Sequence, residues 1–253
     1  MATISDLPPS LLNLIIFAIA LIGVAILSRQ ISIHIQTVVY YLTRSQEMPT
    51  VILFIAFLPG VFVHESAHWA MARLLGLKTG KFRVWPKRQG RTIGLGSVTV
   101  QQGGLWRDSL VGLAPLLVGS ILITLIAQQV FAAYLMTDAL SQGEILSGLS
   151  AFGAAIRAPD GILWAYMLFA IANAMMPSPS DRAPVKPVIL YLGTALALYL
   201  FLGLPLAPLS SVLEQGVPAL QALTSALIFT IVLDIGILIG LFIVELILPT
   251  GRG

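Results

Sequence analysis

The sequence predicts an all-α polytopic membrane protein with about six transmembrane helices and a small membrane-associated β-hairpin after the second helix. Three observations support this fold class: 57% of the 253 residues are hydrophobic, only 10% are charged, and long apolar runs recur along the chain. Soluble domains typically carry about 25% charged residues. The chain has no cysteine, which excludes disulfides, thiolate metal ligands and cysteine nucleophiles.

The apolar runs predict the positions of the helices. A bilayer core about 30 Å thick needs about 20 apolar helical residues. We predict spans at Leu11–Leu27, Val51–Leu75, Ser109–Met136, Gly161–Met176, Val188–Leu204 and Ala219–Leu248. The first is interpreted as a retained anchor, because the leader before it carries Asp6 and no Lys or Arg, unlike a secretory signal peptide. The ambiguous segment Ile31–Leu42 is predicted to be an interfacial amphipathic helix, with His34 at the surface.

The distribution of Lys and Arg predicts the orientation in the membrane. Half of the fourteen cations lie between the second and third spans, namely Lys78, Lys81, Arg83, Lys87, Arg88, Arg91 and Arg107. A cytoplasmic position for this segment also places Arg73, Arg182, Lys186 and Arg252 in the cytoplasm, and leaves Arg29, Arg44 and Arg157 on the other face. Both termini are therefore expected to be cytoplasmic, in a protein of the cell membrane. Lipid headgroups are the expected partner of the basic segment, and nucleic acid is not expected because reading motifs are missing.

The basic segment also contains a predicted β-hairpin. Residues Phe82–Trp85 and Ile93–Val100 alternate in part between apolar and polar, and the intervening PKRQG favours a turn. At the cytoplasmic membrane surface such a hairpin would either cover the helix ends or offer an edge strand to an extended peptide. The sequence leaves both roles open.

The stretch VFVHESAHWA places two of the three histidines within the second predicted span. His-Glu-x-x-His on a helix puts His64 and His68 on one face, one turn apart, where both imidazoles can share a Zn²⁺. Glu65 between them then reaches the metal-bound water as general base. Ionisable residues at membrane depth are costly and indicate function by default. The competing interpretation is a hydrogen-bonded polar cluster in a helix bundle.

A catalytic zinc site needs a third protein ligand besides the two histidines. The acids in or near the spans are Asp181, Asp234 and Glu245. Pro177 and Pro179 must interrupt the helix before Asp181, and a broken helix is tolerated in a bilayer where it lines a cavity or is covered by protein. By the predicted topology, Asp181 lies on the side of the membrane where the second span ends. This position allows it to reach the histidines.

HESAH in one span followed by NAMMPSPSD in a later one resembles the site-2 protease family of intramembrane zinc metalloproteases. That family pairs an H-E-x-x-H helix with a later segment of the type N-x-x-P-x-x-P-x-D-G. Asn173, Pro179 and Asp181 keep the spacing of the Asn, the second Pro and the Asp. Two positions depart from the pattern, because Pro177 is one position late and Arg182 stands where a glycine is usual.

The resemblance implies a zinc-dependent endopeptidase that cuts transmembrane segments of membrane proteins. It implies that His64, His68 and Asp181 bind Zn²⁺, that Glu65 is the catalytic base, and that Asn173 helps to hold the substrate. It also implies a site that opens toward the cytoplasm. The alternative is a catalytically silent relative that acts as a membrane scaffold and binds partners without cutting them.

The resemblance spans residues 51–187, which would form a three-helix metalloprotease core with a β region at 81–102. Residues 1–50 would form an N-terminal transmembrane anchor with the interfacial segment, and residues 188–253 two C-terminal transmembrane helices. In the last helix, Asp234 and Glu245 share one face. Bonds from these acids to neighbouring helices are favoured over an ion path of the kind found in transporters. Gly236 and Gly240 are spaced for close packing against a partner helix.

Overall fold

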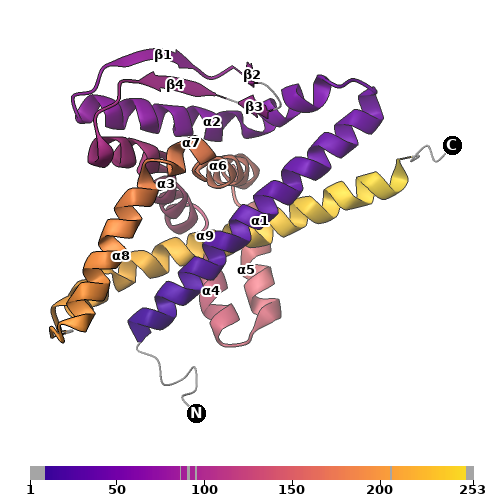
Figure 1. Ribbon diagram of the computed structural model, residues 1–253. Helices are drawn as coiled ribbons and strands as arrows, with labels where there is room; N and C mark the ends of the chain where they lie inside the picture. Colours follow the sequence, from indigo (N-terminus) through magenta and orange to yellow (C-terminus); the bar gives the residue numbers. More distant parts are fainter. Residues whose placement is uncertain (1–8, 86, 90–91, 95, 206, 249–253) are drawn as a thin grey trace.

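The computed structural model describes residues 9–248 except 86, 90–91, 95 and 206. Long helices dominate it, and a small antiparallel hairpin lies beside the second helix (Figure 1), which confirms the predicted fold class. The elements are α1 (Pro9–Thr43), α2 (Met48–Leu74), β1 (Thr79–Arg83), β2 (Lys87–Gln89), β3 (Thr92–Gly94), β4 (Ser97–Val100), α3 (Leu105–Gln129), α4 (Ala133–Ser141), α5 (Ile145–Arg157), α6 (Gly161–Ala174), α7 (Pro179–Arg182), α8 (Val185–Phe201) and α9 (Ala207–Ile247).

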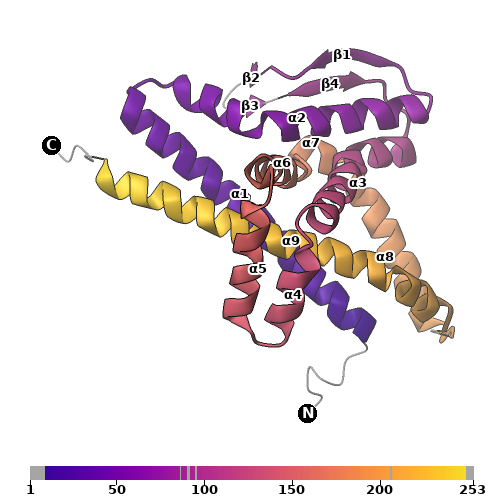
Figure 2. The same cartoon turned by 180° about the vertical axis from the view of Figure 1, so that it is seen from behind.

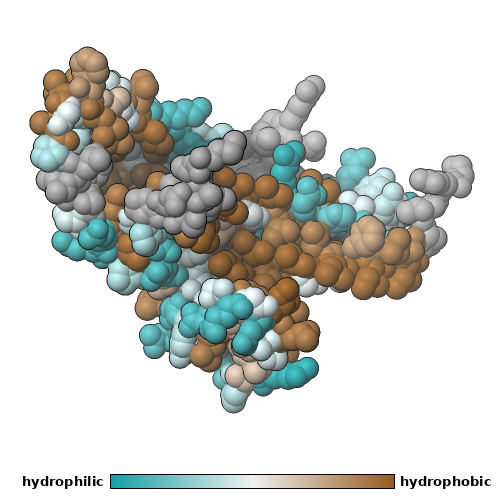
Figure 3. Space-filling view, turned by 90° about the horizontal axis from the view of Figure 1, so that it is seen from below, coloured by the Kyte–Doolittle hydropathy of each residue, from teal (hydrophilic) through white to brown (hydrophobic). Residues whose placement is uncertain are grey.

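Five helical stretches in the described part of the chain are long and apolar enough to cross a membrane. They are Pro9–Thr43, Met48–Leu74, Leu105–Gln129, Pro179–Phe201 and Leu213–Ile247, and the bent pair formed by α5 and α6 raises the number to as many as six. Apolar side chains also cover the outside of the helices (Figure 3): Ile162 is 77% and Phe201 86% exposed. Surface of this kind is favourable in lipid, so the chain is a multi-pass membrane protein.

The core lies where α1, α3, α6 and α9 meet. Its fully buried large side chains include Val24, Ile123, Leu168, Leu227 and Phe229. The third predicted span is shorter than expected, because α3 ends at Gln129 and α4 begins only at Ala133. Helices α4 and α5 form a hairpin that projects from this core (Figures 1 and 2), and α5 meets α6 at a bend of 107°.

The segment Ile31–Leu42 is not a separate interfacial helix, so that prediction is wrong. It continues α1, and Ile31 is fully buried in a cluster with Phe57 of α2 and Phe169 of α6. Ile31 and Val38 of its apolar face are therefore buried against protein, whereas Leu42 at its end is 61% exposed. His34 is not a free surface residue either, since its Nδ1 lies 2.8 Å from Oε1 of Glu245 on α9.

Helices α1 and α9 cross in contact and run in the same general direction (Figures 1 and 2). Gly23 lies against Ile231, and farther along both helices His34 contacts Glu245. Six strictly alternating spans would make the first and last helices antiparallel. The parallel course is therefore at odds with six alternating spans and with two cytoplasmic termini. The side of the membrane on which each terminus lies stays a prediction.

The predicted hairpin is present as two short antiparallel ladders, β1 with β4 and β2 with β3. Lys87–Gln89 of the expected turn pairs with Thr92–Gly94, so the chain reverses at residues 90–91, which lie outside the described residues. The hairpin lies along α2 (Figure 1), where the rings of Trp85 and Phe54 have centroids 5.3 Å apart. It thereby covers the side of α2 on which Glu65 lies.

Two prolines inside helices free carbonyl groups for other partners. A proline has no N–H, so the carbonyl four residues earlier loses its helical hydrogen bond. Pro59 frees the Ile55 carbonyl, which accepts a hydrogen bond from the Tyr166 hydroxyl of α6 at 3.0 Å. Pro115 frees the Val111 carbonyl in the same way, and that group takes part in the candidate site.

Candidate metal centre

His64 and His68 lie one turn apart on the same side of α2, as the motif predicts. Their Nε2 atoms are 3.1 Å apart, and their side chains are 13% and 10% exposed. Helical periodicity alone brings them together, because residues four apart are neighbours on a helix surface. The pair is therefore positioned by local structure and then covered by other elements.

A backbone carbonyl orients each imidazole. Nδ1 of His64 lies 2.8 Å from the Ala174 oxygen, and Nδ1 of His68 lies 2.8 Å from the Val111 oxygen. A carbonyl can only accept, so each Nδ1 carries the hydrogen and donates it. In a neutral imidazole the lone pair is then on Nε2, which is the arrangement of metal-binding histidines. Both lone pairs consequently face the same small space.

The local sequence explains why these two carbonyls are free. Pro115 cannot donate to Val111. A longer α6 would pair the Ala174 carbonyl with the Ser178 N–H, but α6 ends at Ala174 and that N–H donates to Asp181 Oδ2 at 2.8 Å. The end of α6 thus leaves the Ala174 carbonyl free for His64 and the Ser178 N–H free to hold the Asp181 carboxylate.

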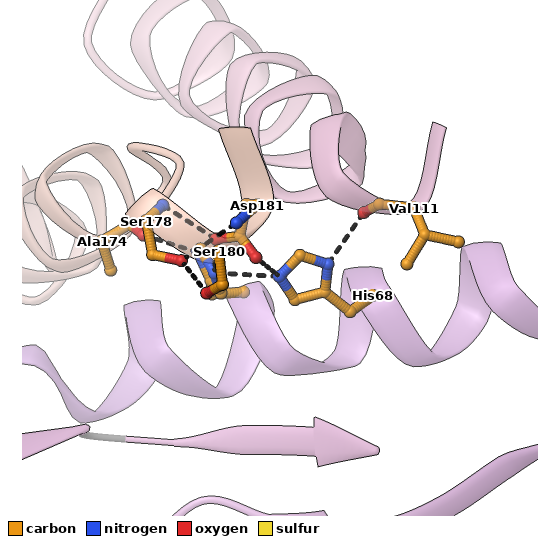
Figure 4. Close-up of polar contacts among 7 residues, drawn as sticks. His68, Val111, Ala174, Ser178, Ser180 and Asp181 are labelled. Carbon is orange, nitrogen blue, oxygen red and sulfur yellow. Dashed lines mark hydrogen bonds and ion pairs between the residues drawn. The ribbon is translucent and has the colours of Figure 1, made fainter. Parts of the chain in front are cut away.

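Asp181 approaches the histidines from α7, the single turn that follows α6 (Figure 4). Its N–H donates to Ser178 Oγ at 3.3 Å, which completes a capping box with Pro179 at the first helical position. The order Ser-Pro-Ser-Asp is the sequence signal for this box, and the family motif does not contain it. Asp181 Oδ1 lies 3.3 Å from Nε2 of His68, and Oδ2 lies 3.5 Å from Nε2 of His64.

The three side chains could hold a metal ion. In a tetrahedral zinc site with bonds of about 2.0–2.2 Å, ligand atoms lie about 3.3–3.6 Å apart. The separations here are 3.1, 3.3 and 3.5 Å. Two imidazole lone pairs and a carboxylate at these distances repel one another unless a cation or a proton lies among them. Figure 4 shows Asp181 facing the His68 ring, with the Val111 carbonyl on the far side of that ring.

Glu65 is the next residue of α2 and lies under the hairpin. It is 7% exposed. A Cβ at Gly96, just before β4, would lie 2.7 Å from both Cγ and Oε1 of Glu65. A larger residue there would force the Glu65 side chain to move, so glycine lets the hairpin pass this close to the carboxylate. The hairpin therefore covers Glu65 beside the histidines, a role that the sequence left open.

A cavity of about 700 Å³ adjoins the three ligands. Its lining combines apolar side chains of α2 with polar groups of α1, β4, α6 and α7, and includes Phe57, Val61, Ser28, Ser97, Asn173 and Glu65. A second hollow of about 350 Å³ lies on the other side of His68 and Asp181. Val98 of β4 lines both spaces, so the strand runs beside the whole site.

Asn173 lines the cavity, but α9 holds its side chain. Its Nδ2 donates to the Phe169 carbonyl at 2.9 Å and to Asp234, with distances of 3.0 Å to Oδ1 and 3.3 Å to Oδ2. Asp234 and Glu245 thus both bond to neighbouring helices, as predicted, since Glu245 contacts His34. The contact between Asp234 and Asn173 had no signal in the sequence. It joins residues 61 positions apart whose spacing follows no motif.

Arg182, one of the two departures from the family pattern, does not disturb the site. Arg182 is exposed, and it is not among the described residues with positive φ, so the position does not require glycine. Its N–H bonds to the Ser178 carbonyl at 3.1 Å, as expected within a helical turn. The predicted close packing at Gly236 and Gly240 is not found in the described chain, because a Cβ at either position meets nothing within 4 Å.

Comparisons with protein-family models, with curated proteins and with solved structures give no match. The resemblance to the site-2 protease family therefore rests on the two motifs and on the positions of the residues that they contain.

Proposed function

We propose that this protein is a zinc-dependent endopeptidase of the site-2 protease type, which cuts transmembrane segments of membrane proteins within the bilayer. The observation that carries the proposal is the arrangement of His64, His68 and Asp181. Two Nε2 lone pairs and a carboxylate meet at the spacing of a tetrahedral zinc site. A structural polar cluster would instead need a proton on one Nε2 atom, so that one imidazole is charged and donates to its neighbours.

The residues of the site have distinct roles in the proposed reaction. Bound zinc would supply an acidified water and a positive charge that stabilises the developing oxyanion. Glu65 would take the proton from the attacking water and then pass it to the leaving amide nitrogen as the peptide bond breaks. The carbonyls of Val111 and Ala174 would keep the two imidazoles in the tautomer that leaves Nε2 free.

The shape of the site suits an unwound polypeptide. A helix about 10–12 Å wide keeps its backbone groups hydrogen-bonded internally, so a transmembrane substrate must unwind before a carbonyl can be attacked. Among the described strands, β4 pairs only with β1, and its residues Ser97 and Val98 line the cavity. The second edge of β4 is therefore placed to pair with an extended substrate segment.

We further propose that the basic segment faces the cytoplasm, that the site opens on that side, and that the protein lies in the cell membrane. Lys81 and Arg83 of β1 are exposed, and Trp85 and Trp106 beside them are 68% and 58% exposed. Cations and tryptophans of this kind gather at the membrane interface. With the N-terminus in the cytoplasm, the parallel course of α1 and α9 would place the C-terminus on the other side if both helices cross.

The test measures zinc content and cleavage on the purified protein in detergent. The wild type should bind one zinc per chain and cut a labelled single-span peptide. Glu65→Gln should keep the zinc and lose cleavage by about 10²–10⁴-fold, because it removes the base but no ligand. Asp181→Ala and Asp181→Asn should lose both zinc and cleavage. Glu144→Gln, at an exposed acid of the α4–α5 turn, is the matched control and should match the wild type.

Two results would contradict the proposal. Appreciable cleavage by Glu65→Gln would remove the base assignment, and stoichiometric zinc in Asp181→Ala would remove the third ligand. Peptide binding by a zinc-loaded wild type that never cleaves would instead favour the alternative, a silent relative that acts as a scaffold.

A further inference from the structure

The last helix reaches the candidate site through one buried carboxylate. Asp234 of α9 is 0% exposed and Asn173 of α6 is 8% exposed, and the two side chains bond directly at 3.0 Å. The Asn173 backbone is also held, because the Ser28 hydroxyl of α1 donates to its carbonyl at 3.2 Å. The first and last helices, both outside the three-helix core, therefore clamp the same residue from two sides.

The hydrogen bonds determine which way the Asn173 amide faces. Its nitrogen lies 2.9 Å from the Phe169 carbonyl oxygen and close to both carboxylate oxygens of Asp234. If the amide were flipped by 180°, its oxygen would lie against the Phe169 carbonyl and the Asp234 carboxylate, and these acceptors would repel it. The nitrogen therefore faces α9. Because the group is planar, Oδ1 faces away from Asp234.

Oδ1 of Asn173 is buried and has no hydrogen-bond partner among the described residues. An unpaired buried acceptor is costly, so such an atom calls for a donor from outside the described chain. Asn173 lines the cavity of about 700 Å³ beside the ligands. Oδ1 itself has almost no exposed surface, so a donor in the cavity reaches it only when the occupant moves the side chains around it. Under the proposed function that occupant is the substrate polypeptide.

We infer that Asp234 is a positioning residue, which holds the Asn173 amide so that Oδ1 accepts a hydrogen bond from a backbone N–H of the substrate. The inference rests on the proposed function and deepens it. An unwound substrate segment in the bilayer has N–H groups that water cannot reach, and an acceptor at the site stabilises that state. Helix α9 is thereby assigned a part in substrate binding.

If Asp234 only positions Asn173, its replacement should leave zinc binding unchanged, unlike the replacement of a residue that holds the fold together. The imidazoles are oriented by Val111 and Ala174 and contact the Asp181 carboxylate, and the contacts that hold them do not include Asp234. Replacing Asp234 should therefore spare the zinc and weaken substrate binding. A residue that merely holds the fold together would lose both.

The experiment measures peptide binding to zinc-loaded Glu65→Gln protein, which does not cut what it binds. The probe is a fluorescent peptide with about 20 apolar residues, interrupted by an Asn-Pro pair that favours unwinding. Asp234→Ala should weaken binding about 10-fold, the equivalent of about 1.4 kcal/mol. Asp234→Asn keeps an acceptor oxygen for Nδ2 and should stay within about 3-fold of the parent. Thr230→Val is the matched control, since Thr230 is buried one turn earlier and its hydroxyl bonds to the Ala226 carbonyl of its own helix.

A double-mutant cycle tests whether Asp234 acts through Asn173. Asn173→Ala should weaken binding as much as Asp234→Ala does, and the double variant should be no weaker than Asn173→Ala alone. All variants should keep one zinc per chain. Parent-like binding by Asp234→Ala, additive effects of the two substitutions, loss of zinc from Asp234→Ala, or no peptide binding by the zinc-loaded parent would each overturn the inference. If peptide binding follows the expected pattern but the protein with wild-type Glu65 does not cleave the peptide, the inference is upheld and the proposed enzymatic activity is overturned.

Discussion

Replacing Gly112 by alanine should weaken zinc binding although Gly112 contributes no side chain to the site. Gly112 lies inside α3, where alanine normally favours the helix by about 1 kcal/mol. A Cβ at this position, however, would lie 2.3 Å from the carbonyl oxygen of Asp181. A carbon–oxygen contact normally needs about 3.4 Å, so the α7 loop would have to retreat by about 1 Å.

A metal site does not tolerate a shift of that size. Metal–ligand distances are held within about 0.2 Å of their ideal values. The carboxylate of Asp181 cannot simply turn back toward the histidines, because its Oδ2 accepts a hydrogen bond from Ser178 at 2.8 Å in the same loop. We therefore expect zinc affinity to fall by at least about 10-fold, equivalent to about 1.4 kcal/mol.

The measurement is competition for zinc with a chromophoric chelator on the purified protein in detergent. Gly193→Ala is the matched control, since Gly193 also lies inside a helix, α8, and a Cβ there meets nothing within 4 Å. Wild-type zinc affinity in Gly112→Ala, alongside a normal control, would refute the reasoning. It would show either that Asp181 is not a ligand or that its loop adapts freely.

Three further predictions concern two helix prolines and the topology in the membrane. Pro115→Ala restores an N–H that competes for the Val111 carbonyl orienting His68, so zinc affinity should fall several-fold, up to about 10-fold. Pro59→Ala restores an N–H opposite the Ile55 carbonyl, which bonds to Tyr166 and not to a metal ligand, so zinc affinity should not change. Equal effects of the two substitutions would contradict the role of Pro115. A reporter inserted within Lys87–Arg91 should read cytoplasmic and one within Asp138–Gly148 external, and the reverse pattern would overturn the orientation. Reporters at the two termini should read opposite sides, and a shared side would show that α1 and α9 do not both cross the membrane.

The features that the sequence by itself determined are local ones. Composition and the length of apolar runs established a multi-pass membrane protein, because the cost of burying charge in lipid applies to any arrangement of the helices. The spacing of His64 and His68 placed both imidazoles on one helix face. The hairpin was readable from alternation and turn residues, and the Ser-Pro-Ser-Asp order contained the capping box that holds Asp181.

Only the tertiary structure decided which distant groups meet. Packing brought Asp181 to the histidines, and it placed Asp234 against Asn173 and Glu245 against His34. The carbonyls that orient the imidazoles are freed locally, by Pro115 and by the end of α6, but only packing brings them to the two rings.

The same limit explains the wrong prediction for Ile31–Leu42. Lipid tails are as apolar as a leucine side chain, so hydropathy does not distinguish a helix face that meets lipid from one that meets another helix. The partners of each face, and with them the site, are therefore set by the shapes that pack together.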